Sequence, residues 1–532
     1  MTTYDHIVIG AGSAGCVVAA RLSEDPHRSV LLIEAGGSNR RLDVRAPAAF
    51  SKQFHSKVDW DYFCEPEAGL DGRGLYQPRA KMLGGCSSMN AMLYIRGNRL
   101  DYEEWVEQGA KGWSYDEVLP HFVKSENNKR LRDGYHGTGG PLDVTAIPTA
   151  DELAAEFIAA AQASGITSND DFNGAEQDGV GMPQVTQRDG TRWDTATAFI
   201  TPARKRPNLT VLTGALVHKV IIEGGRAVGV ELSRKGKTTI ARASSDIVVS
   251  GGAFGTVEVL QRSGIGPADH LRSLGIAPVV DLPAVGANLM EHPLIGLYFE
   301  LAGGARGMFD VPGPFDAPKP KYLYQWLRHK AGPLSSNVAE ALAHVRSNSS
   351  LPAPDLQLLM IPGYFYGDGT TKHPVPAFTL AASLIAPKSR GSVMIQSSDP
   401  RRKAAVRLNF FDHPDDLSAM VQSLRMLREI AASAPLSTHA GPEFLPGPDV
   451  VDDAGLSSFI RREVLHTFHP SCTARIGGPD DGAVDPELRV YGVEGLRVAD
   501  TSVFPTIIRG NTNAPAIMVG ERCADFIRNP AA

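Results

Sequence analysis

The pattern of apolar and polar positions divides the chain into two kinds of segment. Short runs of consecutive apolar residues, closed by glycine or a charged residue, predict buried strands at 4–9, 30–33, 209–212 and 247–250. Apolar residues at helical spacing predict helices over 151–165, 415–432 and 513–527. Residues 101–150 are expected to form a helix-rich connection. The chain therefore combines helices and strands, as an α/β protein does.

A different pattern appears in the second half of the chain. Predicted strands at 356–361, 378–385 and 392–395 are separated by turns and not by helices, which favours an antiparallel sheet. Residues 217–222 and 227–232 flank Gly224-Gly225 and predict a hairpin. Residues 303–320, rich in glycine and proline, predict a mobile loop that serves as a lid.

Length then makes two interleaved domains the natural expectation. A chain of 532 residues is too long for one simple core. We assign 1–150, 208–298 and 446–532 to a domain with the parallel strands. Residues 151–207 and 299–445 are assigned to a discontinuous second domain built on the antiparallel sheet.

Charge and cysteine content exclude several classes of function. The net charge of −6 argues against nucleic acid as a partner, because such proteins are usually basic. Five cysteines without a CxxC or Cys/His pattern predict no metal site and reduced thiols, as in a cytoplasmic protein. No apolar run approaches the ~18 residues of a membrane span, and no leader pattern begins the chain. Peripheral contact with a membrane stays open.

The N-terminal strand runs into a dinucleotide fingerprint. Residues 10–15 read GAGSAG, a predicted helix follows, and the next strand ends at Glu34. Gly10 permits the tight turn, Gly12 lets the backbone approach a pyrophosphate, and Gly15 lets the helix pack on the sheet. Glu34 is placed to bond a ribose hydroxyl, and its charge disfavours the 2′-phosphate of NADP. The motif alone does not separate NAD from FAD.

A second loop of small residues, Gly84-Gly85-Cys86-Ser87-Ser88, precedes Asn90. Small side chains let the backbone press against a flat ligand, and the hydroxyls and the Asn90 amide add directed hydrogen bonds. Buried apolar neighbours favour a ligand contact here over a plain surface loop.

The C-terminal region carries the groups for a reaction. His469 is followed by a strand that ends at Asp500, then by Asn511 and by a helix expected to begin at Asn513. A helix that starts with free N–H groups suits an anionic or anion-forming cofactor. Asn511 and Asn513 are both of a residue type that caps helices, and we expect Asn513 to cap this one.

Taken together, these motifs resemble the glucose–methanol–choline (GMC) oxidoreductases, which are FAD enzymes. The resemblance covers nearly the whole chain and rests on GAGSAG with Glu34, AKMLGGCSSMNAMLYIRG, GGAFGTVEVLQRSGIG, VGANLMEHP, HTFHPSCTARIG and GLRVADTSVFPTIIRGNTNAP. Departures occur at Val257, Cys472 and Cys86. Some relatives carry at the Met89 position a histidine bonded to the flavin, so the resemblance implies non-covalent FAD here.

The resemblance implies a Rossmann-type FAD-binding domain, a second substrate domain and an alcohol-oxidising activity. The catalytic positions correspond to His469 and Asn511. The implied FAD contacts are Gly10, Gly12, Ser13, Gly15, Glu34, Gly85, Asn90, Val217, Asp500 and Thr512.

The residues themselves suggest how an alcohol would be oxidised. An imidazole such as His469 accepts the hydroxyl proton, Asn511 holds the carbinol oxygen, and the flavin accepts hydride. The helix that begins near Asn513 stabilises the charge of a reduced flavin. Asp500 is expected to bind the ribityl chain or the backbone. The electron acceptor stays open between O2 and a quinone-like compound. A redox-neutral hydroxynitrile lyase of the same fold and a non-catalytic flavin protein are the alternatives.

The sequence says little about which alcohol is used. Choline would require an acidic or aromatic cage, and no such cluster stands out. Aromatic residues gather at 309–326 and at 364–366, which suggests apolar or aryl alcohols or, equally, ordinary core packing.

Overall fold

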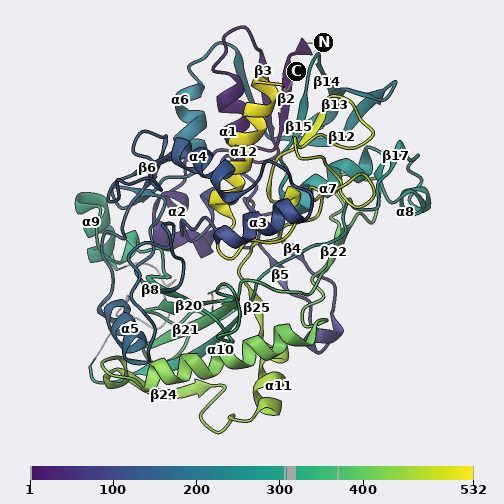
Figure 1. Ribbon diagram of the computed structural model, residues 1–532. Helices are drawn as coiled ribbons and strands as arrows, with labels where there is room; N and C mark the ends of the chain where they lie inside the picture. The colour runs from purple at the N-terminus through teal and green to yellow at the C-terminus, as the bar shows by residue number, and fades with distance from the viewer. Residues whose placement is uncertain (1–2, 305–306, 308–318, 368, 370, 531–532) are drawn as a thin grey trace.

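The computed structural model describes residues 3–304, 307, 319–367, 369 and 371–530 (Figure 1). Most of the predicted lid, 303–320, lies outside the described residues. The parallel sheet occupies the upper part of Figure 1 and the antiparallel sheet the lower part. The mixed α/β fold with these two sheets confirms the predicted fold class.

The upper part is built on a five-stranded parallel sheet in the order β11-β3-β2-β15-β26. These strands are Leu209–Thr213, Val30–Glu34, His6–Ile9, Ile247–Val249 and Leu496–Val498. The strands β3, β2, β15 and β26 are buried at every position. Burial on both faces is why β2, β3 and β15 carry the apolar runs 7–9, 30–33 and 247–249. The sheet joins the two ends of the chain, with β15 between β2 and β26.

Two helices from opposite ends of the chain pack together beside this sheet. They are α1 (Ser13–Leu22) and α12 (Asn513–Arg528), and Figure 1 shows them side by side. A third helix, α7 (Gly252–Arg262), follows β15 after a glycine turn. The predicted helical connection contains α3 (Arg99–Glu107) and α4 (Tyr115–Ser125).

The predicted hairpin is part of a small separate sheet. β12 (Ala215–Glu223) and β13 (Arg226–Arg234) pair across Gly224-Gly225, whose φ angles of 59° and 81° suit glycine. β14 (Lys237–Ala243) and β1 (Thr3–Tyr4) extend this sheet. β14 is not predicted, because it is mostly polar. The predicted strand at 4–9 is divided in the structure between β1, which ends at Tyr4, and β2.

The lower part is a large antiparallel sheet in the order β24-β18-β21-β20-β19-β8, with β25 paired to β18. The strands are Ala440–Leu445, Pro293–Leu301, Ala377–Leu384, Leu356–Ile361, Ala341–Val345, Gly179–Gly181 and Leu465–His466. β18 spans the predicted boundary at residue 298, and all of it belongs to this sheet. The predicted strand at 392–395 is β22 (Ser392–Met394), which instead pairs with β23 (Ala405–Arg407).

Helices cover this sheet and shorter elements complete the chain. α10 (Pro414–Ala432) runs along it in Figure 1, and α5 (Glu152–Ala163) packs against α10 and β19. Further helices are α2 (Leu42–Arg45), α6 (Thr201–Ala203), α8 (Ala268–Ser273), α9 (Pro320–His329) and α11 (Asp453–Glu463). Further strands are β4 (Tyr62–Phe63), β5 (Tyr76–Gln77), β6 (Glu126–Asn128), β7 (Leu142–Val144), β9 (Gln187–Arg188), β10 (Thr191–Arg192), β16 (Ile265–Gly266) and β17 (Val280–Asp281).

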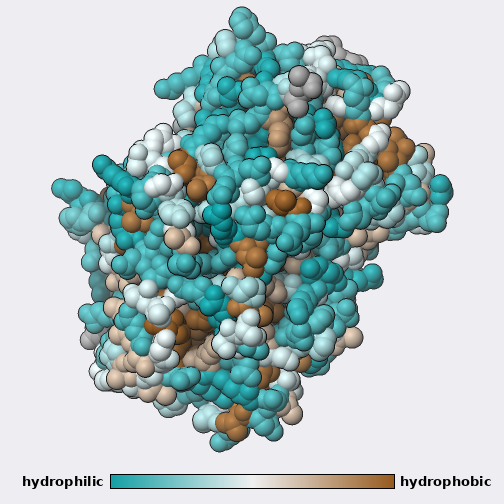
Figure 2. Space-filling model, viewed as in Figure 1, coloured by the Kyte–Doolittle hydropathy of each residue, from teal (hydrophilic) through white to brown (hydrophobic). Residues whose placement is uncertain are grey.

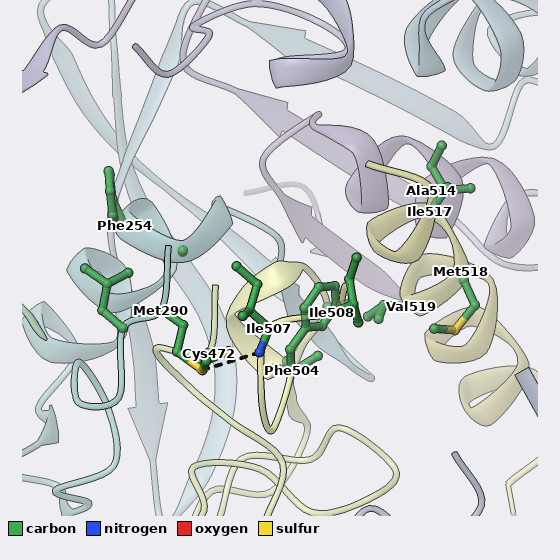
Figure 3. Close-up of a cluster of buried hydrophobic side chains, with 14 of the residues drawn as sticks. Phe254, Met290, Cys472, Phe504, Ile507, Ile508, Ala514, Ile517, Met518 and Val519 are labelled. Carbon is green, nitrogen blue, oxygen red and sulfur yellow. Dashed lines mark hydrogen bonds between the residues drawn. The ribbon is translucent and has the colours of Figure 1, made fainter. Parts of the chain in front are cut away.

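A buried cluster holds the C-terminal segment in place between the two parts (Figure 3). Phe504 and Ile508 are fully buried, as is Met518 of α12, and the backbone N–H of Ile507 contacts Sδ of Met290 at 3.4 Å. Each fully buried side chain of this kind contributes about 1.5–3 kcal/mol. The segment that leads to Asn511 is therefore firmly anchored.

The face of the molecule seen in Figure 2 is mostly hydrophilic, with hydrophobic residues scattered across it. Among the described helices, none has the length and apolar character needed to cross a bilayer.

Candidate active site

A cavity of about 340 Å³ is lined by residues of both sheets. Its walls include every predicted site residue except Gly15: Gly10, Gly12, Ser13, Glu34, Gly85, Asn90, Val217, His469, Asp500, Asn511 and Thr512. Segments almost 500 residues apart in the chain therefore meet around one space, as the sequence predicts.

The glycines of the first turn are required for two different reasons. A Cβ on Gly10 would lie 2.3 Å from the carbonyl oxygen of Ser250, and one on Gly15 would lie 2.0 Å from that of Gly10. These two glycines allow close backbone packing. A Cβ on Gly12 would meet no atom within 4 Å, because Gly12 faces the cavity at the N-terminus of α1. That open space suits a pyrophosphate.

The acid at the end of β3 lies in the same wall. The Glu34 carboxylate accepts hydrogen bonds from the backbone N–H groups of Ala11 (2.9 Å) and Gly36 (2.7 Å). Burial raises the pKa of Glu34 to about 6, although both N–H groups oppose this shift. Glu34 thus shapes the glycine turn and still borders the cavity.

The second small-residue loop presses directly on the first. Gly85 has a φ of 51°, and a Cβ on it would lie 2.6 Å from Cα of Gly12. The Oδ1 atom of Asn90 accepts from the backbone N–H of Met92 (3.1 Å) and from Nη1 of Arg192 (2.8 Å). Both contacts use the oxygen, so the Asn90 amide presents its N–H donors to a ligand.

Arg192 does not line the cavity itself but holds Asn90, which does, and the sequence does not reveal this role. It is buried, and it also donates from Nε to the carbonyl of Val44 and from Nη1 to that of Ser87. Burial lowers its pKa to about 10. A basic residue in a polar stretch of sequence gives no sign that it is buried. The role of Arg192 becomes clear only once the structure places β10 beside the loop at 84–88.

In the C-terminal region, Asp500 binds the backbone, one of its two predicted roles, whereas the predicted cap of α12 is wrong. Asp500 accepts from the hydroxyl of Thr256 (2.6 Å) and the backbone N–H groups of Gly252 and Ser502 (both 2.8 Å), so it binds the backbone at the start of α7. Asn513 does not cap α12. It is the first helical residue, Thr512 occupies the N-cap, and Oδ1 of Asn513 accepts from the hydroxyl of Ser13 (2.7 Å).

The predicted catalytic pair meets in the wall of the cavity. Nδ2 of Asn511 lies 3.3 Å from Nε2 of His469. Nδ1 of His469 lies 2.8 Å from the hydroxyl of Thr467 and 3.1 Å from Nδ1 of His292. The imidazole is therefore held from one side, while Nε2 and the Asn511 amide border the cavity.

The surroundings keep this imidazole neutral. Burial, with smaller effects of His292 and the positive Arg79, holds the pKa of His469 well below its usual value. The backbone N–H of His469 donates to Oε1 of Glu291 (2.7 Å). Burial in turn raises the pKa of Glu291 to about 7. A neutral imidazole is the form that accepts a proton.

Two polar residues of the antiparallel sheet complete the group, and the sequence does not reveal them. Nε2 of Gln357 on β20 donates to Oδ1 of Asn511 (3.3 Å) and lies 3.1 Å from Nε2 of His344 on β19. Burial lowers the pKa of His344 to about 3, so this neutral ring accepts the hydrogen bond. A glutamine inside an apolar strand marks such a position only once the strand is known to face the cavity.

The lining of the cavity fits FAD. The hydroxyl of Ser250 is buried in the wall without a partner among the described residues, and Gly12 leaves room beside the N-terminus of α1. Polar groups gather on the side of the parallel sheet. The opposite side carries apolar residues such as Phe50, Leu294 and Ile361, which suit an organic substrate.

Comparison with known proteins agrees with this arrangement. Family models described as GMC oxidoreductase match residues 4–294 and 387–520. An oxygen-dependent choline dehydrogenase of Rhizobium rhizogenes is 39% identical over 531 residues, which cover 98% of this chain and 95% of that protein. One of Sinorhizobium fredii is also 39% identical, with the same coverage.

Solved structures share the whole fold. Pyridoxine 4-oxidase from Mesorbium loti superposes with a TM-score of 0.90 at 30% identity and covers 100% of both chains. Formate oxidase from Aspergillus oryzae, in a structure concerned with FAD modification, gives a TM-score of 0.91 at 28% identity and covers 99% of this chain and 98% of its own. On the family models and the choline dehydrogenase relatives, the chain belongs to the GMC oxidoreductase family.

Proposed function

We propose that the protein oxidises an alcohol to an aldehyde or ketone with non-covalently bound FAD and with His469 as the proton acceptor. As a GMC oxidoreductase, the protein is a flavoenzyme that acts on CH–OH groups. The observation that carries the finer proposal is the pair formed by Nδ2 of Asn511 and Nε2 of His469, 3.3 Å apart on the cavity wall.

The reaction follows from the chemistry of these two side chains. An alcohol oxygen placed between them accepts a hydrogen bond from the Asn511 amide and donates one to Nε2 of His469. His469 then takes the hydroxyl proton, because its lowered pKa keeps the ring neutral near pH 7. FAD, when bound, supplies the acceptor for the hydride. The N-terminus of α12 adjoins Asn511 and favours negative charge there.

The direct test is reduction of the flavin without oxygen. Mixing the holoenzyme anaerobically with a panel of primary and secondary alcohols should bleach the flavin absorbance. His469→Ala should slow this bleaching about a hundredfold or more, since general-base catalysis contributes on that order. His218→Ala, on β12 and outside the cavity lining, is the matched control. Undiminished bleaching by His469→Ala would refute the role proposed for His469.

Non-covalent attachment rests on the residue at position 89. Met89 lines the cavity and is 4% exposed, and its thioether lacks the nucleophilic nitrogen of a histidine. Acid precipitation should therefore release all flavin into the supernatant. Flavin that stays with the pellet would contradict this part of the proposal.

The electron acceptor is tested separately. Peroxide formation during aerobic turnover, compared with reduction of a quinone-like dye, separates an oxidase from a dehydrogenase.

The other candidate function, a redox-neutral hydroxynitrile lyase, is not favoured, because the relatives named above are dehydrogenases and oxidases. If the holoenzyme cleaved a hydroxynitrile and no alcohol bleached its flavin, the lyase function would be favoured instead.

A further inference from the structure

We propose that the substrate of this site is an uncharged alcohol with an aryl or branched alkyl group, and that choline is a poor substrate. This inference rests on the proposed alcohol oxidation and specifies its substrate class. It departs from what the names of the choline dehydrogenase relatives suggest, and the reason lies in the chemistry of the cavity wall.

A series of phenyl rings leads along the wall to the catalytic histidine. The ring centroids of Phe365 and Phe50 lie 6.3 Å apart, those of Phe50 and Phe54 5.9 Å, and those of Phe54 and Phe468 5.8 Å. Phe468 directly precedes His469. These distances are typical of rings in contact, so the four rings form one continuous apolar wall.

Aliphatic side chains complete this wall. The lining residues of the same buried cluster are Met89, Leu93, Leu294, Val338, Leu359 and Ile361. Among the described aromatic residues of 309–326 and 364–366, Phe365 alone lines the cavity. Trp326 is buried and donates to the carbonyl of Gly190, and Tyr364 and Tyr366 pack on Tyr298. Phe309 and Phe315 lie outside the described residues.

The acidic residues of the described cavity lining lie on the side of the parallel sheet. Among the described lining residues the carboxylates are Glu34, Glu258 and Asp500, each on an element of the parallel-sheet part or its helix α7. Glu34 and Asp500 are engaged by backbone N–H groups, as described above. Glu258 accepts from the backbone N–H of Ala404 (2.8 Å) and lies 3.5 Å from Nη1 of Arg262. The described phenyl wall therefore offers no anionic partner for a cation.

A positive charge adjoins the phenyl wall. Arg79 lines the cavity, and its Nη2 donates to the carbonyl of Phe468 at 2.7 Å. An arginine stays protonated in proteins. Glu291 does not present a compensating negative charge to the substrate, because Glu291 lies outside the cavity lining. Its Oε1 accepts from the backbone N–H groups of His469 and His292.

Two larger rings in the cavity are also unsuited to hold a quaternary ammonium. Nζ of Lys81 lies 4.3 Å from the ring centroid of Trp60, so one cation already occupies that ring. The ring centroids of Tyr62 and Phe254 of α7 lie 5.2 Å apart, and Nζ of Lys403 lies 5.7 Å from the Tyr62 centroid. A cation moved from water to this wall loses hydration and meets no counter-ion among the described lining residues. Contact with an aromatic ring returns about 0.5–1 kcal/mol at an exposed site and about 2 kcal/mol or more when desolvated, with tryptophan a better partner than phenylalanine.

The test compares choline with its uncharged isostere, 3,3-dimethylbutan-1-ol, and with benzyl alcohol. The rate of anaerobic flavin reduction at several concentrations gives kcat/KM for each alcohol with the holoenzyme. We expect both neutral alcohols to exceed choline about tenfold or more, equivalent to about 1.4 kcal/mol. A value for choline equal to or above that of its isostere would overturn the inference. If no alcohol bleaches the flavin, it is the proposed oxidation itself that fails.

Variants of the phenyl wall test the same point from the protein side. Phe50→Leu and Phe365→Leu should lower kcat/KM for benzyl alcohol about tenfold and leave that for 3,3-dimethylbutan-1-ol within about threefold. Phe410→Leu, a buried phenylalanine outside the lining, is the matched control. Unchanged flavin absorbance in each variant shows that the cofactor site is intact. Equal losses for both alcohols would overturn the role of the rings in selecting the substrate.

Discussion

The Asn511 amide faces Nε2 of His469 with its nitrogen, because its oxygen is already occupied by Gln357. This orientation makes Asn511 a donor at the point where an alcohol oxygen would lie. His469, held at Nδ1 by Thr467 and His292, presents Nε2 at the same point. The pair thus combines one donor and one acceptor, as an alcohol requires.

Asn511→Ala removes the donor and leaves the imidazole in place. We expect kcat/KM for the best alcohol to fall about tenfold to a hundredfold, because the carbinol oxygen is no longer held for reaction. Asn511→His should retain more activity than the alanine variant, since an imidazole N–H can take the place of the amide. Stopped-flow reduction of the flavin, normalised to bound flavin, measures both. An alanine variant as fast as the parent would exclude a role for Asn511.

Gln357 is expected to act as a positioning residue. Gln357→Leu removes the donor to Oδ1 of Asn511, so the amide becomes free to turn its oxygen toward His469. We expect kcat to fall several-fold with little change in KM, since a lost hydrogen bond costs about 0.5–1.5 kcal/mol. Gln396→Leu, at an exposed loop position, is the control.

A double variant separates this role from simple loss of packing. An imidazole at position 511 has no amide to orient, so Gln357→Leu should cost much less in an Asn511→His background than in the parent. Steady-state kinetics of the four proteins give the coupling between the two positions. Equal losses in both backgrounds would show that Gln357 does not act through Asn511.

The sequence predicts the parts of the site that depend on local spacing. The glycine turn, Glu34 and the order of His469, Asp500 and Asn511 are read from short motifs, and the structure brings them to one cavity. Gln357 and His344 escape prediction, because they reach the site through the pairing of β19 with β20. Within an apolar strand, nothing in the local pattern distinguishes a polar residue facing a cavity from one satisfied in the core.

The cap of α12 shows a second limit of the same kind. Asn513 is a plausible cap by residue type, and the structure instead pairs its side chain with the hydroxyl of Ser13. A partner 500 residues away decides its role. The aromatic clusters likewise look alike in the sequence, and only the packing of Phe365 beside Phe50 separates cavity wall from core.

The two kinds of glycine in the first turn lead to opposite predictions. In Gly12→Ala the methyl group enters the empty space beside α1, so the fold should be unaffected and FAD binding should weaken about tenfold or more. In Gly15→Ala the methyl group would lie 2.0 Å from a carbonyl oxygen, so the fold itself should lose about 1–3 kcal/mol. Flavin content per chain and the Tm of flavin-free protein distinguish the two. A lowered Tm in the flavin-free Gly12→Ala protein would contradict the assignment.

Glu291 predicts a dependence of stability on pH. Burial raises its pKa from 4.5 to about 7 in the folded protein, so the folded state holds this proton more tightly than the unfolded state does. The resulting stabilisation is complete below pH 4.5 and is lost as the pH rises to about 7, by a total on the order of 3 kcal/mol.

Glu291→Gln keeps an oxygen that can accept from the backbone N–H groups of His469 and His292 and removes the titrating carboxyl. Between pH 5 and pH 7.5, we expect the Tm of the parent to fall relative to that of the variant. Above pH 7.5, the difference between the two Tm values should stay constant. Glu152→Gln, at an exposed position on α5, controls for the general effect of losing one acid. A difference in Tm that is the same at every pH would mean that Glu291 remains ionised in the folded protein throughout this range.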